Sequence, residues 1–86
     1  MHTPLLELDI NGRFARVNLN AISDKRVSNA ALRVLAALGA FAGKGNRCWV
    51  GTRRIAAETG VNQADVVRHI QKLRELGYVM VSPHRG

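Results

Sequence analysis

Residues 49–81 constrain the fold more than any other part of the chain, because two helical patterns there are separated by a glycine and followed by a β-branched run. Gly60 supplies the positive φ that ends the first helix, and Gly77 stops the second. Thr52 is expected to cap the first helix and Asn62 the second, since their side-chain oxygens can accept backbone N–H groups. This order of signals predicts a helix, a tight turn, a second and longer helix, and then a strand.

The second of these helices has one apolar and one polar face. Four apolar side chains recur at helical spacing on the first face: Val66, Ile70, Leu73 and Leu76. Exposed Arg and Gln side chains near a helix N-terminus suit the major groove of DNA, because Arg donates two hydrogen bonds to guanine and Gln pairs with adenine. The alternative is an ordinary amphipathic helix with a solvated polar face. The capped partner helix and the glycine turn favour the DNA-reading interpretation.

Short motifs follow one another in a fixed order from Ser28 onward. After an apolar helix and a glycine-rich loop, they are Cys48-Trp49, Arg54-Ile55-Ala56, Gly60-Val61, Asn62, and Leu73 to Val79. This order resembles that of the winged helix-turn-helix domains of bacterial, plasmid and phage DNA-binding proteins, of both the regulator and the replication-initiator type. The resemblance implies a mainly α fold with a small β component (α+β), in which a short strand over residues 47–50 pairs with a wing over residues 78–81.

The same resemblance implies a division of roles between the two helices. In such domains the second helix lies in the major groove, the N-terminus of the first helix contacts phosphate, and the wing contacts the flanking backbone. Carried over to this chain, base contacts are expected from Gln63, Ala64, Val67, Arg68 and Gln71. Backbone contacts are expected from Thr52, Arg53, Lys72 and Arg85. Because Asp65 is acidic, either the predicted DNA site depends less on phosphate contacts, or the Asp65 carboxylate faces the first helix.

Charge is distributed unevenly along the chain. The chain carries 13 Lys and Arg against 6 Asp and Glu, a net charge of +7. Residues 28–86 hold nine basic and three acidic residues (+6), whereas residues 1–27 hold four and three (+1). The excess therefore lies in the helix-turn-helix half of the chain, where an anionic backbone would be met. Phosphate attraction is expected from Arg53, Arg54, Lys72 and Arg85.

Residues 1–20 predict an N-terminal β-hairpin. Asn11-Gly12 is the strongest two-residue hairpin signal, because both positions tolerate the positive φ of a type I′ turn. The resulting register places five apolar side chains on one face: Leu6, Leu8, Ile10, Ala15 and Val17. An isolated hairpin is marginally stable, so this face is expected to pack on the helices or to join a second subunit. Residues 21–86 are assigned to the winged helix-turn-helix domain, and the two parts to one compact domain.

A long apolar helix is expected over residues 29–42, with Ser28 as its cap. Arg33 is its only charged residue, and its faces are apolar or small nearly all round. The helix is therefore either central and covered on two sides, or presents one face to a partner in a homodimer. Gly39 costs about 1 kcal/mol relative to alanine in a helix interior, so close packing against another backbone is its expected reason.

Several functional classes find no support in the sequence. Cys48 is the single cysteine, which excludes an internal disulfide and fits a reduced cytoplasmic setting, on the bacterial nucleoid or a plasmid. No apolar run approaches a membrane span. No metal-ligand spacing, glycine-rich phosphate loop or catalytic Ser/His/Asp set is present, so neither a cofactor nor enzymatic activity is expected.

The interpretation that follows is sequence-preferring binding to double-stranded DNA, with transcriptional repression by occlusion as the leading role. An origin- or centromere-like-site-binding domain of a plasmid or phage replication or maintenance protein is the first alternative. A protein-interaction winged helix is the second, from another class. Residues 82–86 resemble the tip of a wing without its returning strand. The chain is therefore expected to be the DNA-binding fragment of a longer protein, or a short form with half a wing.

Overall fold

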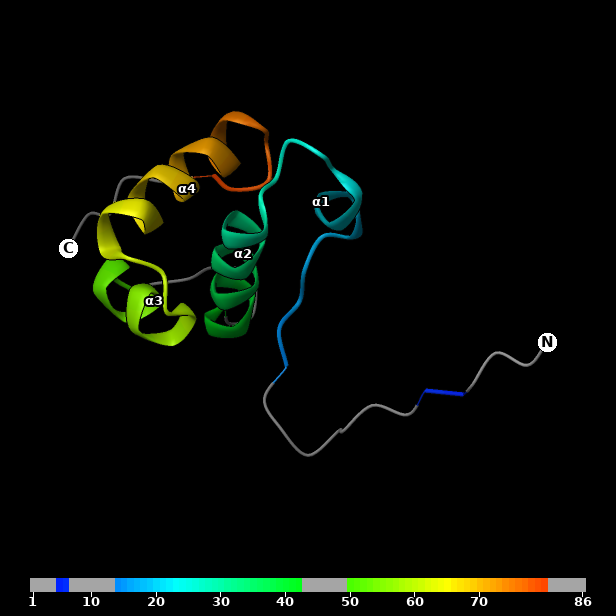
Figure 1. Ribbon diagram of the computed structural model, residues 1–86, viewed down its shortest axis with the longest axis horizontal. Coiled ribbons are helices and arrows are strands. Elements are labelled where there is room, and N and C mark those ends of the chain that lie inside the picture. Colours follow the sequence, from blue (N-terminus) through cyan, green and yellow to red (C-terminus); the bar gives the residue numbers. More distant parts are fainter. Residues whose placement is uncertain (1–4, 7–13, 43–49, 81–86) are drawn as a thin grey trace.

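The computed structural model describes residues 5–6, 14–42 and 50–80, and these ranges contain four helices and no strand (Figure 1). The helices are α1 (Leu19–Ser23), α2 (Asn29–Phe41), α3 (Thr52–Thr59) and α4 (Gln63–Glu75). Helices α2, α3 and α4 pack on one another, and α1 lies on the opposite side of α2 from α3 and α4.

Side-chain caps fix where two of the helices begin. The Ala31 N–H donates to Ser28 Oγ at 3.1 Å at the start of α2, and the Ala64 N–H donates to Asn62 Oδ1 at 2.8 Å at the start of α4. Both predicted caps are confirmed. The predicted cap at Thr52 is wrong, because Gly51 is the N-cap of α3 and forms no side-chain cap.

The turn between α3 and α4 is closed by a glycine and a buried hydroxyl. Gly60 has a φ of 73° and its N–H donates to the Ala56 carbonyl at 2.9 Å, which confirms its predicted role. Thr59 Oγ1 donates to the Ile55 carbonyl at 2.7 Å and accepts the Val61 N–H at 3.2 Å. The hydroxyl therefore links the last turn of α3 to the connecting residue and fixes the direction in which the chain enters α4.

Helix α4 ends in a Schellman motif around Gly77, as its position in the sequence predicts. Gly77 has a φ of 88°, and its N–H donates to the Arg74 carbonyl at 3.1 Å. The Tyr78 N–H donates to the Leu73 carbonyl at 2.9 Å. These two bonds satisfy carbonyls that have no partner inside the helix and turn the chain back toward the core.

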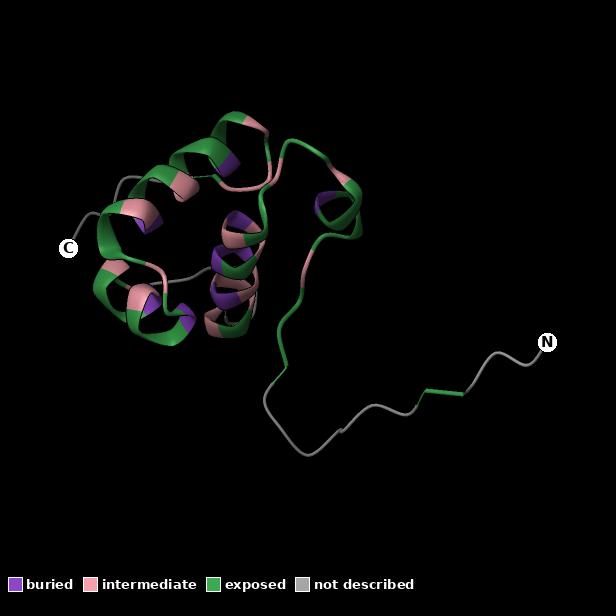
Figure 2. Cartoon of the chain, viewed as in Figure 1, coloured by how far each residue is buried: buried purple, intermediate pink, exposed green. Residues whose placement is uncertain are grey.

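The core lies where α2, α3 and α4 face one another (Figure 2). Its largest fully buried side chains are Val34, Ile55, Val66 and Leu73. Small residues of α2 and α1 complete it: Ala31, Ala37 and Ala21. The predicted apolar stripe of α4 is thus divided, with Val66 and Leu73 fully buried and Ile70 packed at the edge of the core.

Gly39 brings the N-terminal region against α2. A Cβ atom at this position would lie 2.1 Å from the carbonyl oxygen of Arg16. No side chain fits in that space, so glycine lets the backbone of residue 16 pass directly over the helix. The predicted reason for Gly39, packing against another backbone, is confirmed, and the backbone belongs to the same chain.

The predicted α+β class, a winged helix-turn-helix with an N-terminal hairpin, is wrong for the described part of the chain, which is all-helical. The Asn11-Gly12 turn lies outside the described residues. Residues 14–18 form no ladder, and Asn18 instead caps α1 by accepting the Asn20 N–H at 2.9 Å. Of the predicted apolar face, Leu6 and Ala15 are exposed, whereas Val17 packs against the helical core.

Residues 50 and 78–80 form no strand, while residue 81 of the predicted wing and residues 47–49 of its predicted partner lie outside the described residues. Tyr78 and Val79 pack against the helical core without pairing in a sheet. The β-branched and aromatic composition of this run fits a half-buried surface, which contributes to apparent β propensity even without strand pairing.

Candidate nucleic-acid interface

The exposed face of α4 carries all five predicted base-reading residues. Gln63, Ala64, Val67, Arg68 and Gln71 are each exposed. Their spacing along a helix places them within one face, opposite the buried Val66 and Leu73. The structure therefore brings these side chains together on a surface that the protein core leaves free.

Gln63 is held by the neighbouring helix. Its Nε2 donates to Thr52 Oγ1 at 3.0 Å, although the two residues are eleven positions apart in the sequence. Each residue is the first of its helix, so the bond joins the N-termini of α3 and α4. A predicted base-reading residue and a predicted backbone-contacting residue thus lie side by side.

Arg68 forms an ion pair with Asp65, one turn earlier on the same helix. The hydrogen bond from Arg68 lowers the pKa of the Asp65 carboxyl below its ordinary value. The Arg68 side chain remains 73% exposed, so its guanidinium is oriented without being buried. Asp65 therefore pairs with a residue of its own helix, and not with α3 as one of the two alternatives expected.

The N-terminus of α3 offers backbone donors without a side-chain cap, because Gly51 has no side chain to accept them. Such uncapped N–H groups and the positive end of the helix dipole favour an anion. Arg53 is exposed beside them. Arg54 is also exposed, but its guanidinium lies 5.0 Å from the centre of the Phe41 ring, so it packs α3 against the end of α2.

Two exposed basic residues lie toward the other end of α4. Lys72 was predicted as a backbone contact, and Arg74 was missed. Arg74 stands three residues after Gln71 and seven after Val67, a spacing that places it on the same face one turn further along. That spacing was the signal available in the sequence. Arg85, the last predicted contact, lies outside the described residues.

A polar cluster ties the end of α1 and the loop after it to the segment that follows α4. Tyr78 Oη donates to Asp24 Oδ2 at 2.8 Å, and Arg26 Nη2 and Nε donate to the same carboxylate at 2.8 and 2.9 Å. The Asp24 side chain is only 9% exposed. The hydrogen bonds from Arg26 and then from Tyr78 hold the pKa of this carboxyl far below its ordinary value, and the same carboxylate raises the pKa of Tyr78. No local pattern in the sequence indicates this contact between residues 54 positions apart.

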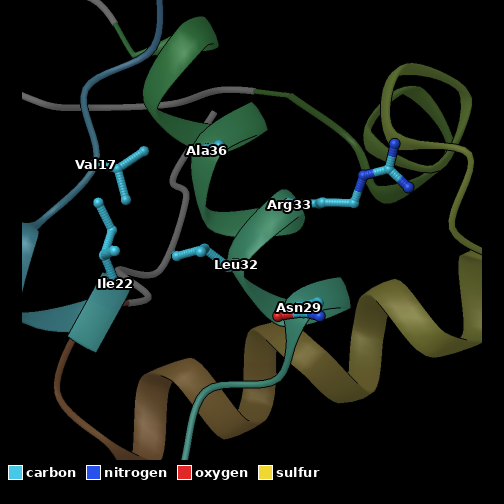
Figure 3. A pocket seen from close by; sticks show the side chains of 6 residues that line it. All are labelled: Val17, Ile22, Asn29, Leu32, Arg33 and Ala36. Carbon is cyan, nitrogen blue, oxygen red and sulfur yellow. The ribbon is translucent and has the colours of Figure 1, made fainter. Parts of the chain in front are cut away.

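An apolar groove of about 420 Å³ lies between the N-terminal region and α2 (Figure 3). Val17, Ile22 and Leu32 point toward one another across it, with Ala36 and Asn29 along α2, whereas the Arg33 side chain points away. Ile22 belongs to α1, which lies on the side of α2 away from α3 and α4, so the groove is on that side. It is therefore separate from the exposed face of α4.

Over the described ranges the chain offers neither a membrane-spanning helix nor a metal-binding cluster. No helix there is both long and apolar enough to cross a bilayer. Nor do three His, Cys, Asp or Glu side chains gather there as ligands for a metal ion.

A known protein family matches the part of the chain that contains α2, α3 and α4. The family described as "Helix-turn-helix domain" matches residues 25–79, from the loop before α2 to the segment after α4. This match covers more than half of the chain, so the chain belongs to that family and is a helix-turn-helix DNA-binding domain. Neither the comparison with curated proteins nor the comparison with solved structures finds a match.

Proposed function

We propose that this helix-turn-helix domain binds double-stranded DNA with sequence preference by placing the N-terminal half of α4 in the major groove. The observation that carries the proposal is the exposed face of α4, where Gln63 and Arg68 are both oriented by polar partners and neither is buried. Arg pairs with guanine and Gln with adenine through two hydrogen bonds each, so this face has the chemistry to distinguish base pairs.

Phosphate contacts would set the register of the domain on DNA. The uncapped N-terminus of α3 with Arg53, and Lys72 and Arg74 on α4, supply donors and positive charge on either side of the base-reading residues. Such contacts orient a protein but carry no sequence information of their own. Arg85 stays a predicted backbone contact, outside the described residues.

The proposed biological role is transcriptional repression by occlusion, without enzymatic chemistry or a cofactor. Occupying a promoter is enough to block transcription, so a domain of this kind needs only affinity and specificity. The same binding chemistry would serve a replication or plasmid-maintenance protein at an origin. Placing the selected DNA site over a promoter, and separately in a test plasmid lacking an origin, distinguishes repression from replication.

The function is tested by selecting bound sequences from random duplexes and measuring affinity over a range of salt concentrations. If roughly four to six phosphates are neutralised, the logarithm of the binding constant falls with the logarithm of salt at a slope of about −4 to −5. Arg68→Ala is expected to cost about 1–3 kcal/mol on the selected site and to relax preference at one base step. Absence of binding to any duplex at low salt would overturn the proposal.

The groove beside α2 supports a homodimer as the DNA-bound form. A second copy is the proposed occupant, because the groove lies across α2 from the basic α4 face. Two copies could therefore pair there while both α4 faces stay free. Ile22→Glu, at an exposed apolar side chain of the groove, is expected to abolish a dimer seen by sedimentation. A chain that stays monomeric on its selected site would overturn this part of the proposal.

A further inference from the structure

The hydrogen bond between Gln63 and Thr52 joins two side chains whose backbones cannot easily move relative to each other. Helices α3 and α4 pack through Ile55 and Val66, which are both fully buried. The connecting turn is fixed by Thr59 and Gly60. The Thr52 hydroxyl is therefore presented to Gln63 from a rigid position, 3.0 Å from its Nε2 atom.

This bond restricts what the Gln63 carboxamide can do. One of its two N–H donors is used by Thr52, which leaves the Oε1 acceptor and one N–H available. An acceptor and a donor on one planar group are what adenine requires at its N6 amino group and N7 atom. Because Gln63 is exposed, this remaining pair is open to an incoming base edge.

The bond also reduces the conformational entropy that the Gln63 side chain loses when it binds a base. A glutamine loses much rotational freedom when it is fixed against a base, and that loss reduces the affinity gained from the contact. A side chain already held in place before DNA arrives loses less. Thr52 retains its own hydroxyl proton, which it can donate to a phosphate oxygen while it accepts from Gln63.

We propose that Thr52 is a positioning residue that holds Gln63 for reading adenine, so that base preference on α4 depends on a hydroxyl supplied by α3. This inference rests on the proposed function, binding of duplex DNA through α4. It assigns Thr52 a role in specificity in addition to the backbone contact expected from the sequence.

The test measures how strongly the 86-residue chain prefers its selected duplex over duplexes changed at single base pairs. The result for each variant is a ratio of two affinities, so a uniform loss of backbone binding cancels. Gln63→Ala should remove the preference for an A·T pair at one position. Thr52→Val, which keeps the shape but lacks the hydroxyl, should lower that same preference by about fivefold or more. Thr52→Ser should restore it.

Two controls separate positioning from general effects. Ser23→Ala removes a hydroxyl that donates to the Asn20 carbonyl within α1, far from the interface, and should leave every ratio unchanged. In the double variant of Thr52→Val and Gln63→Ala, the preference should be no weaker than in Gln63→Ala alone, because the two residues act through one contact. Thermal unfolding of each variant verifies that it folds, and Thr52→Ala replaces Thr52→Val if the latter does not.

The outcomes are distinguishable. If the unaltered chain binds with a base preference that Thr52→Val leaves intact, the positioning role of Thr52 is wrong and the proposed function stands. If Thr52→Val lowers the affinity for all duplexes by the same factor, Thr52 is a backbone contact alone. If the unaltered chain binds no duplex at low salt, the proposed function fails and this inference fails with it.

Discussion

The two sides of α2 are both covered by apolar residues of this chain, but only one side buries large side chains. On one side, α3 and α4 bury large side chains completely, among them Ile55 and Leu73. On the other side, α1 has five residues and buries only Ala21, while Leu19 remains 76% exposed. Apolar content alone does not make a core, since a helix needs enough turns to present a continuous stripe.

Removing one large apolar side chain from each side of α2 should change the free energy of unfolding by very different amounts. Leu73→Ala is expected to lower the free energy of unfolding by about 2–5 kcal/mol, because it leaves a cavity at a position with no exposure. Leu19→Ala is expected to change it by less than about 0.5 kcal/mol, as at most surface positions. Denaturant unfolding of both variants measures the difference. Similar losses would mean that Leu19 is buried as deeply as Leu73.

Asp24 connects the two regions, and its contribution should depend on pH. Its pKa in the folded state lies below the ordinary 3.8, so its stabilisation is fully present above that pH and is lost as the pH falls through the folded value. We expect Asp24→Asn to be less stable at neutral pH and to show a shallower acid decline. Acid unfolding followed by circular dichroism checks this.

Two further variants, Tyr78→Phe and Asp65→Asn, test whether the acid decline of stability depends on the Asp24 cluster. Tyr78→Phe removes one hydrogen bond to Asp24 and should give part of the Asp24→Asn effect. Asp65 also has a lowered pKa, but its side chain is 43% exposed and water screens its pair with Arg68. Asp65→Asn should therefore change the acid decline much less. An equal change in the two Asn variants would contradict a special role for the Asp24 cluster.

Gly39→Ala has two opposing effects: it favours the helix α2 and disfavours the packing of residue 16 against it. Alanine favours the helix by about 1 kcal/mol, whereas its Cβ would lie 2.1 Å from the Arg16 carbonyl oxygen. We expect the backbone near residue 16 to be displaced while α2, α3 and α4 stay folded, with a net stability change below about 1 kcal/mol. Amide chemical shifts of residues 14–18 report the displacement.

Ala40→Gly is the matched control for this substitution. It changes an exposed neighbour in α2 and should lower stability by about 1 kcal/mol without moving residues 14–18. If Gly39→Ala also leaves those shifts unchanged, the passage of Arg16 over the helix is not maintained in solution.

The part of the fold that could be predicted from the sequence is the packed group of helices α2, α3 and α4. The helices from α2 to α4 are marked by signals that act over a few residues: the caps at Ser28 and Asn62, and the positive φ of Gly60 and Gly77. Side-chain periodicity then identified the exposed face of α4. These predictions held because local signals and tertiary packing favour the same structure.

The errors arose where a local signal needed a distant partner. Asn11-Gly12 favours a hairpin, but a hairpin also needs an apolar surface to cover it, and Leu6 and Ala15 of its predicted apolar face are exposed. The bonds of Tyr78 to Asp24 and of Gln63 to Thr52 join residues far apart in the sequence. No periodicity encodes such pairs, because they depend on how whole helices meet.

The smallest expected effect comes from removing a single positive charge, which either region can lose. Lys72 lies on α4, and Lys25 lies in the loop between α1 and α2; both side chains are exposed. If DNA meets only the α4 side, Lys72→Ala releases about one counterion fewer on binding and reduces the salt slope by about 1, for any duplex sequence. Lys25→Ala leaves the slope unchanged although the net charge falls equally. Titrations at several salt concentrations measure both. Equal changes would show that attraction depends on total charge and not on the face that α4 presents.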